Sequence, residues 1–310
     1  MSTATQPFIV PRSGLTALLQ DYAEFFKLRV TSLIVMTAWC GYYLGSVKSG
    51  VSSLQWGLLH ALLGIGLVSG GTAAFNEIIE RREDALMRRT QHRPLPANRL
   101  GLIHAVLLAS LATFGGVAYL YNFANPGTAL LSLATAIAYL GLYTPLKKMS
   151  PWCTFVGAFP GAMPGLLGWT AARGRLEVEA LVLFAIVFFW QFPHFHSIAW
   201  LYREDYENAE IRMLPVVDAD GKSTIRAILL YLAALIPVSL APTLLHMAGR
   251  AYFVGALALG LAFLAIGVRL ASLKMPPAKP RSKQRARQVL IASVFYLPLL
   301  FALMMLNAVA

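Results

Sequence analysis

The sequence contains little cysteine and little charge. Among its 310 residues are two cysteines, Cys40 and Cys153, which both lie inside apolar runs and have no CxxC spacing. A disulfide framework or a thiolate metal site is therefore not expected. Charged residues make up only 13% of the chain, and no polar stretch is long enough for a separate soluble domain. These deficits exclude an ordinary soluble protein.

Apolar residues dominate instead, at 57% of the chain with a mean hydropathy of +0.62. Runs close to the ~20 residues that cross a hydrocarbon core recur along the sequence. They cover residues 29–47, 54–77, 101–121, 128–146, 152–171, 178–201, 225–247, 251–270 and 288–308. We predict an all-α polytopic membrane protein with nine transmembrane helices in one bundle around a central cavity.

The N-terminal region differs from the rest. Its first 24 residues are polar with scattered apolar positions, contain two acids and lack a small-residue cleavage site, so they do not resemble a secretory signal. We expect residues 1–26 to form an interfacial or disordered tail, and residues 27–310 to form the membrane domain.

Basic residues predict the topology, because cytoplasmic loops are enriched in Lys and Arg. With nine spans and a cytoplasmic N-terminus, 22 of the 26 basic residues lie on the cytoplasmic side. The net charge of +12 is then explained by topology and by attraction to anionic lipid, with no nucleic acid as partner. The short tail has one Arg in its first 26 residues, which favours a bacterial inner membrane over a mitochondrial one.

The densest charge follows the second apolar run. If that helix continues, Asn76, Glu80 and Asp84 recur every four residues and stack their oxygens on one face. Such a ladder suits Mg²⁺, which takes oxygen ligands and bridges carboxylates to substrate phosphates. Three candidate phosphate-binding residues come directly after it, namely Arg88, Arg89 and Arg93. The alternative is a solvated basic loop between two membrane helices.

The fourth apolar run ends in a second polar motif. Tyr143 and Lys147 are four residues apart and would share a face if the helix continues past Pro145. Lys147 could hold a diphosphate as a point charge, or it could anchor the helix end at the lipid headgroups. Both interpretations stay open for Lys147.

The sixth apolar run contains three polar residues, Gln191, His194 and His196. Polar groups inside a membrane are costly unless they face a cavity or a partner, so a functional cavity is expected. A packing role is the alternative, since a lone His is more often a satisfied core residue. Beyond the run, Asp205 would bring a carboxylate opposite Asp84, so that both could clamp Mg²⁺ around a diphosphate.

Together these groups predict a site that is apolar on the membrane side and cationic at the rim, with metal-binding carboxylates between. A polyprenyl diphosphate has the matching shape. Mg²⁺ and basic side chains would stabilise the charge that develops on the leaving diphosphate, which predicts a prenyltransferase.

Three ordered motifs carry a resemblance to a known family. They run from Asn76 to Leu95, from Tyr143 to Lys148, and from Trp190 through Phe195 to Arg203-Glu204-Asp205-Tyr206. The chain resembles the UbiA-type intramembrane prenyltransferases, and its third motif resembles the haem branch, the protohaem IX farnesyltransferases or haem O synthases.

The resemblance implies transfer of farnesyl from farnesyl diphosphate to a vinyl group of haem B, with water addition, to give haem O and diphosphate. Mg²⁺ is the implied cofactor, held by Asn76, Glu80, Asp84 and Asp205. Arg203 joins the implied diphosphate-binding residues, and Gln191, His194 and His196 the implied haem contacts. The resemblance also implies a multi-pass protein of the cell inner membrane whose active site faces the cytoplasm. A haem A synthase, which would take the product, is a candidate partner.

Two positions depart from the family pattern. Glu80 stands where the family usually has Asp, which lengthens the arm by one methylene. The superfamily's second acidic motif has carboxylates four apart, whereas Leu201 and Ala209 flank Asp205 at that spacing, so only Asp205 carries over.

Two other functions remain as alternatives. One is prenyl transfer to another aromatic acceptor, such as a quinone precursor or a chlorophyll-type ring. The other is membrane transport, although transporters usually bind substrate near the bilayer midplane and these charges lie at one rim.

Overall fold

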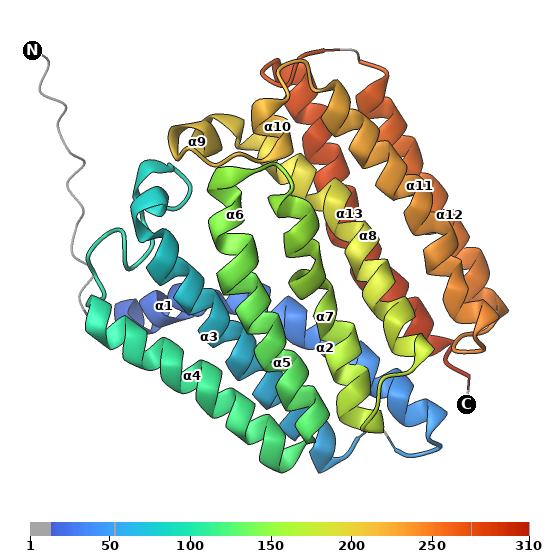
Figure 1. Cartoon of the computed structure of the whole chain (residues 1–310). Coiled ribbons are helices and arrows are strands. Elements are labelled where there is room, and N and C mark those ends of the chain that lie inside the picture. The colour runs from blue at the N-terminus through green and yellow to red at the C-terminus, as the bar shows by residue number, and fades with distance from the viewer. Residues whose placement is uncertain (1–13, 53, 274, 310) are drawn as a thin grey trace, which may run out of the picture.

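The computed structural model describes residues 14–52, 54–273 and 275–309. The regular secondary structure of this part of the chain is all helical, apart from one isolated antiparallel bridge between Ala248 and Ala308. Figure 1 shows the helices packed as one bundle. They are α1 (Leu15–Phe25), α2 (Leu28–Lys48), α3 (Trp56–Leu86), α4 (Leu102–Phe123), α5 (Pro126–Ile137), the π-helix η1 (Ala138–Tyr143), α6 (Thr144–Met149), α7 (Cys153–Arg173), α8 (Val178–Leu201), α9 (Arg203–Asn208), α10 (Leu214–Val217), α11 (Lys222–Leu244), α12 (Arg250–Ala271) and α13 (Pro280–Leu306).

In the described residues, 8 stretches of helix are long and apolar enough to cross a membrane. They are α2, α3, α4, the continuous run from α5 through η1 to α6, α8, α11, α12 and α13. The remaining predicted segment, residues 152–171, is α7, which has 21 residues but is diluted by glycine and by Pro160 and Pro164. The all-helical membrane fold is confirmed, and the count of nine spans stays a prediction.

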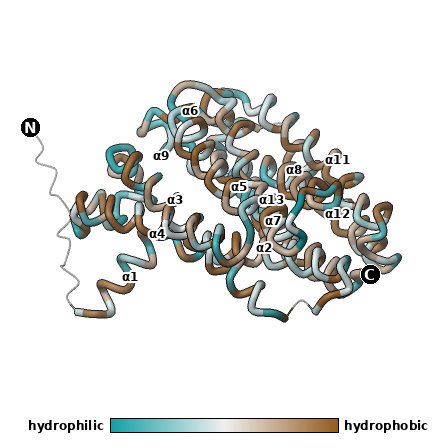
Figure 2. The backbone as a smooth tube through the Cα atoms, turned by 60° about the horizontal axis from the view of Figure 1, so that its bottom comes forward, coloured by the Kyte–Doolittle hydropathy of each residue, from teal (hydrophilic) through white to brown (hydrophobic). Residues whose placement is uncertain are grey.

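Large apolar side chains cover the outside of the bundle. Ile103, Leu111 and Leu130 are among many that are mostly exposed, while the largest fully buried side chains include Trp169 and Trp200. Figure 2 shows apolar backbone segments spread over the long helices. Because the backbone of a helix satisfies its own hydrogen bonds, such a surface is suited to lipid. An apolar exterior around a packed core is thus the expected result of the composition.

Glycines bring α2 and α7 into backbone contact. A Cβ atom on Gly168 would meet the carbonyl of Ala38, and one on Gly41 would meet the carbonyl of Gly165. Small residues at helix crossings allow this close approach in membrane proteins. The crossing fixes α7 against α2, the helix that begins next to the candidate site.

The N-terminal segment is more ordered than a structureless tail. Residues 15–25 form α1, which packs against α3 and α2, while residues 1–13 of the predicted tail lie outside the described part of the chain. Phe25 is fully buried between α3 and α4 in a cluster with Ala74 and Ala105. Residues 15–25 of the predicted tail are therefore an integral helix of the bundle.

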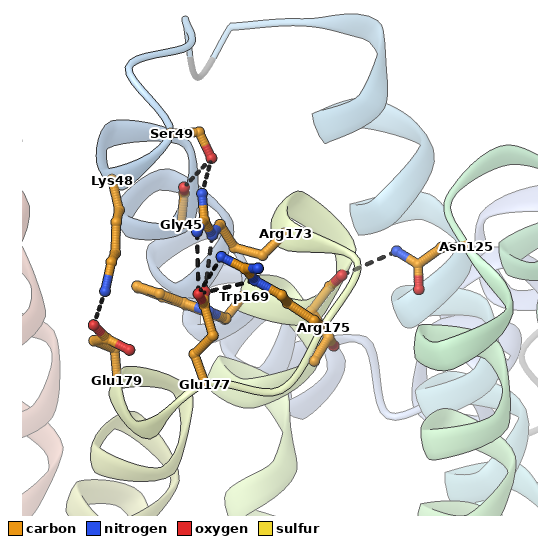
Figure 3. Close-up of polar contacts among 10 residues, drawn as sticks. Gly45, Lys48, Ser49, Asn125, Trp169, Arg173, Arg175, Glu177 and Glu179 are labelled. Carbon is orange, nitrogen blue, oxygen red and sulfur yellow. Dashed lines mark hydrogen bonds and ion pairs between the residues drawn. The ribbon is translucent and has the colours of Figure 1, made fainter.

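An ion-pair cluster closes the end of the bundle where α7 and α8 meet (Figure 3). Glu177 accepts hydrogen bonds from Arg173 Nε at 2.8 Å, from Trp169 Nε1 at 3.0 Å and from Arg175 Nε at 3.0 Å. The hydrogen bond from Arg173, aided by Trp169 and the charges of both arginines, lowers the pKa of Glu177 to about 2. Nearby, Lys48 of α2 pairs with Glu179 of α8. These contacts tie α2, α7 and α8 together at this end.

Candidate active site

The three predicted oxygen donors lie along α3 in the arrangement that their spacing requires. The helix has 31 residues and continues to Leu86, so it includes the whole stretch from Asn76 to Asp84. Asn76 and Asp84 are each 1% exposed, and the side chain of Glu80 is 13% exposed. The predicted ladder is therefore present and largely shielded from water.

Each member of this ladder contacts a basic side chain from a different part of the chain. The contacts are Lys27 Nζ to Asn76 Oδ1 at 2.7 Å, Lys147 Nζ to Glu80 Oε1 at 2.6 Å, and Arg93 Nη1 to Asp84 Oδ2 at 2.6 Å. A charge removed from water must be paired with an opposite charge or hydrogen-bonded. The ladder therefore faces a region of positive charge, supplied by three separate segments.

Lys27 was not among the sequence-predicted site residues. It precedes α2 with a positive φ of 46°, and this turn directs the side chain to α3. Burial lowers the pKa of Lys27 to about 8, with a further contribution from the charge of Arg93, against the attraction of Glu80 and Asp84. The only sequence signal was a basic residue at the start of an apolar run, which usually indicates topology alone.

The loop after α3 folds back onto the ladder. Thr90 Oγ1 donates a hydrogen bond to the Asp84 carbonyl at 2.9 Å, and Arg93 pairs with the Asp84 carboxylate. Burial by itself lowers the pKa of Arg93, but the charge of Asp84 and its hydrogen bond outweigh burial and raise it. Arg93 therefore stays a cation at this position, as a phosphate-binding residue must.

A π-helix shapes the second motif. Pro145 has no N–H to donate to the preceding turn, and the chain widens over η1 before α6 begins. Thr144 fills the wide turn, donating to the Tyr139 carbonyl at 2.9 Å and accepting from Asn76 Nδ2 at 3.3 Å. Lys147 Nζ lies 4.6 Å from the centre of the Tyr143 ring. The predicted proximity of Tyr143 and Lys147 is thus present, but only Lys147 contacts α3, at Glu80, while the Tyr143 ring packs against Gly157 of α7.

Of the other two predicted arginines, one links the motifs. Arg89 Nη2 donates to the Tyr206 hydroxyl at 3.0 Å, and its guanidinium lies over the rings of Tyr202 and Tyr206, 5.2 and 5.5 Å from their centres. Arg88 is exposed, and no side-chain contact is seen for it within the described residues. The loop after α3 and helix α9 therefore lie side by side, as a site built from both motifs requires.

The acidic residue of the second motif makes no contact with the ladder among the described residues. Asp205 is half-buried on α9, next to Tyr206, and its carboxylate has no hydrogen-bond partner among the described residues. Arg203 donates to the carbonyls of Val216 at 3.1 Å and Asp218 at 3.5 Å, so it braces α10 and does not contact the ladder. No group of three His, Cys, Asp or Glu side chains within the described ranges could hold a metal ion.

The three predicted haem contacts of α8 have different surroundings. Gln191 Nε2 donates to the carbonyls of Ala158 and Val187 at 3.1 and 3.2 Å. His194 Nδ1 lies 2.8 Å from Ser293 Oγ on α13, and its ring stacks on Trp190.

His196 differs from both. It is 3% exposed, and its Nδ1 has no partner in the part of the chain that the structure describes. A buried polar atom without a partner requires an explanation, and a ligand contact is one. Gln191 and His194 fit the packing alternative, whereas His196 keeps a free hydrogen-bonding group.

A cavity of about 370 Å³ adjoins the ladder, between α3 and the η1–α6 segment. Its lining combines charged and apolar groups, namely Ile79, Glu80, Glu83, Leu140, Gly141, Thr144, Pro145, Lys147, Lys148 and Ile211. A second cavity, of about 180 Å³, lies at the end of α2 near Lys48 and is lined mainly by apolar side chains. Of these two cavities, the larger has the carboxylates of Glu80 and Glu83 in its wall and is the candidate site.

Comparison with known proteins identifies the family of this chain. Residues 34–294 match the UbiA prenyltransferase family. A protoheme IX farnesyltransferase from Koribacter versatilis (strain Ellin345) is 58% identical over 307 residues, which cover 99% of both chains.

Two solved structures share the fold. A digeranylgeranylglyceryl phosphate synthase superposes with a TM-score of 0.74 at 17% identity, covering 93% of this chain and 98% of its own. A UbiA homologue from Archaeoglobus fulgidus, bound to GPP and Mg²⁺, gives 0.62 at 16% identity, covering 92% of this chain and 99% of its own. This chain is a multi-pass membrane prenyltransferase and belongs to the UbiA prenyltransferase family.

Proposed function

We propose that this enzyme transfers the farnesyl group of farnesyl diphosphate to a vinyl group of haem B and thereby forms haem O. The central observation is the α3 ladder, in which Asn76, Glu80 and Asp84 each face a basic group. The identity of 58% to a protoheme IX farnesyltransferase supports the choice of substrates.

The donor set of the ladder fits Mg²⁺. Asn76, Glu80 and Asp84 each present an oxygen that contacts a positive group, which supports a cation site at this position. Asp205 on α9 would add a carboxylate from the other motif. When bound, Mg²⁺ would stabilise the charge that develops on the leaving diphosphate.

The basic groups of this chain would bind the diphosphate itself. Lys147 and Arg93 already lie against the ladder, and Arg89 lies beside α9, so a diphosphate between α3 and α9 would meet cations from three sides. Lys27, Arg88 and Tyr143 complete this set. Arg203 would act indirectly, through the α10 segment that it braces.

The reaction then follows from charge. The C–O bond of farnesyl diphosphate breaks with its electron pair leaving on the diphosphate, where Lys147 and Arg93 stabilise it. The vinyl π electrons of haem B form the new bond to the allylic carbon. Water adds to the resulting cation and releases a proton, which completes the hydroxyethylfarnesyl group.

On α8, we assign the haem contact to His196, whose Nδ1 is buried without a partner among the described residues.

The proposed setting is the cell inner membrane with nine spans, in which α7 crosses beside α2. The charge asymmetry of the loops supports a cytoplasmic N-terminus, because 22 of 26 basic residues then face the cytoplasm. The ladder and α9 would open to the same side. A haem A synthase would be the partner that takes the product.

The test is to incubate membranes that contain the protein with haem B, farnesyl diphosphate and Mg²⁺, and to follow the haem by mass spectrometry. We expect a haem product that is heavier by one farnesyl group and one hydroxyl group, because the added water releases a proton. Asp84→Asn and Asp205→Asn should each lower its rate of formation by about 10²–10³-fold, whereas Asp220→Asn, in an exposed pair with Lys222, should not. Unchanged haem beside a prenylated phenolic acceptor would show that the acceptor is wrong, and normal turnover by both Asn variants would overturn the metal site.

A further inference from the structure

Helix α1 has an exposed apolar face that no other part of the described chain covers. Leu15, Leu18 and Leu19 are 73%, 46% and 59% exposed, and their spacing puts them on one side of the helix. The span α2 begins at Leu28, only three residues after α1 ends. Figure 2 shows α1 at an edge of the bundle.

The position of this face identifies its partner. The exposed Leu102 and Ile103 begin α4, and α1 lies against the same helix, because the Tyr22 hydroxyl is 2.9 Å from His104 Nε2. The leucines of α1 thus continue the apolar surface that the bundle offers to lipid. An amphipathic helix at the border of a span is suited to the headgroup and acyl boundary of a bilayer.

The opposite face of α1 binds the loop that carries the phosphate-binding arginines. Asp21, which is 8% exposed, accepts from Arg99 Nε at 3.0 and 3.2 Å and lies 2.9 Å from Arg99 Nη2. This is a two-pronged pair with little solvent around it, and such pairs are geometrically specific. Asp21 therefore fixes the position of Arg99.

Arg99 passes this constraint on to the active site. Its Nη2 donates to the His92 carbonyl at 2.9 Å, and the next residue is Arg93, which pairs with Asp84. Leu95 is buried against Phe25 of α1 in the same apolar cluster. The conformation of residues 90–99 is thus held from α1 by one ion pair and one apolar contact.

A second connection leaves the end of α1. Lys27 follows the helix after Phe26 and reaches Asn76 with its ammonium group at 2.7 Å. Two of the three cations at the ladder, Lys27 and Arg93, therefore depend on where α1 lies.

We propose that α1 is a membrane-seated brace, in which the three leucines rest in the bilayer interface and Asp21 acts as a positioning residue. It holds Arg99, and through Arg99 it holds the 90–99 loop with Arg93 at the diphosphate site. The partner of the exposed face is the lipid surface. The kinetic part of this inference rests on the proposed function, whereas the structural part does not.

The first test uses the full chain in lipid nanodiscs and compares Asp21→Asn with the parent. Hydrogen exchange of residues 90–99 should become at least tenfold faster, and the KM for farnesyl diphosphate should rise about tenfold, the loss of one charge-assisted contact. We expect kcat and the KM for haem to stay within twofold, and Asp21→Glu to restore most of the effect. Asp220→Asn, which alters an exposed pair, is the matched control.

A double-mutant cycle of Asp21→Asn and Arg99→Gln distinguishes loss of this ion pair from general destabilisation of the protein. If Asp21 acts through Arg99, the double variant should exchange no faster than either single variant. Additive effects, or unchanged exchange in Asp21→Asn, would overturn the brace.

A triple variant with Leu15, Leu18 and Leu19 changed to Ser tests the lipid contact. It should loosen the loop in nanodiscs by as much as Asp21→Asn does, and unchanged protection would overturn the bilayer seat. The structural and functional proposals can fail separately. If the parent farnesylates no haem while Asp21→Asn still loosens the loop, the brace stands and the proposed function fails.

Discussion

We expect Asp84→Asn to lower the stability of the protein slightly and its prenyltransferase activity strongly. Arg93 Nη1 lies 2.6 Å from Asp84 Oδ2, Asp84 is 1% exposed and the Arg93 side chain is 19% exposed. The substitution keeps the shape and an acceptor oxygen but removes the charge. A charge-assisted hydrogen bond is worth about 1.5–3 kcal/mol and a neutral one about 1 kcal/mol, so we expect the free energy of unfolding to fall by about 0.5–2 kcal/mol.

The double variant Asp84→Asn with Arg93→Gln provides the internal check. Removing one partner of a buried pair leaves the other uncompensated, whereas replacing both with neutral groups is often close to neutral. We therefore expect the double variant to be more stable than Asp84→Asn alone. Thermal unfolding followed by tryptophan fluorescence measures this, with an expected shift of roughly 2–5 °C for the single variant.

Activity should respond differently. Both variants lose a carboxylate from the proposed Mg²⁺ ligands, so product formation should fall by about 10²–10³-fold, the range found when one electrostatic contact to a transition state is removed. Restored stability in the double variant should not restore turnover. Mass spectrometry of haem gives the rate, and the Mg²⁺ concentration needed for half-maximal rate should rise.

Asn125→Ala supplies a control of equal stability cost. Its side chain caps α5 by accepting from Thr128 N at 2.8 Å and holds the Thr170 carbonyl at 2.9 Å, at the end of α7 away from the ladder. Loss of such a cap costs about 1 kcal/mol. This variant should lose stability and keep its turnover. If Asp84→Asn behaves in the same way, Asp84 is only a structural partner of Arg93 and our reasoning on the metal is refuted.

Three further changes test other parts of the structure. Gly168→Val places a side chain against the Ala38 carbonyl, so the crossing must open, and we expect at least about 1–3 kcal/mol of destabilisation in thermal unfolding. Lys27→Met keeps the volume but removes the ammonium, so the KM for farnesyl diphosphate should rise about 10–100-fold in steady-state assays. Glu177→Gln should make the free energy of unfolding less dependent on pH under acidic conditions. The folded pKa of about 2 lies below the ordinary glutamate value of 4.5, so the stabilisation is present above pH 4.5 and lost as the pH falls towards 2.

Each of these has an outcome that contradicts it. Gly141 has open space around its Cβ position, so Gly141→Ala should be tolerated, and an equal loss there would mean that backbone contact is not the cause at Gly168. An unchanged KM in Lys27→Met would limit Lys27 to a structural contact with Asn76. Acid unfolding of Glu177→Gln that matches the parent would show that Glu177 is no better stabilised when folded than when unfolded.

The amino-acid sequence by itself determined the helices and one face of the site. Apolar runs of membrane length can only satisfy their backbone as helices, and the four-residue interval from Asn76 to Asp84 places its oxygens on one face. These features depend on neighbours in the chain, and local geometry decides them. The family resemblance added the substrates, which neither composition nor spacing could provide.

The tertiary structure alone decided which partner each side chain has. Lys27 contacts Asn76, 49 residues away, and Arg99 contacts Asp21, 78 residues away. Neither separation belongs to a repeating pattern, such as the helical repeat, that can be recognised in the sequence. Arg203, predicted at the diphosphate, instead holds the Val216 carbonyl. Its side chain is long and flexible, so the nearest uncompensated acceptor determines where its charge lies. That acceptor exists only once α9 and α10 have packed, because the contacts of charged side chains are a property of the assembled helices.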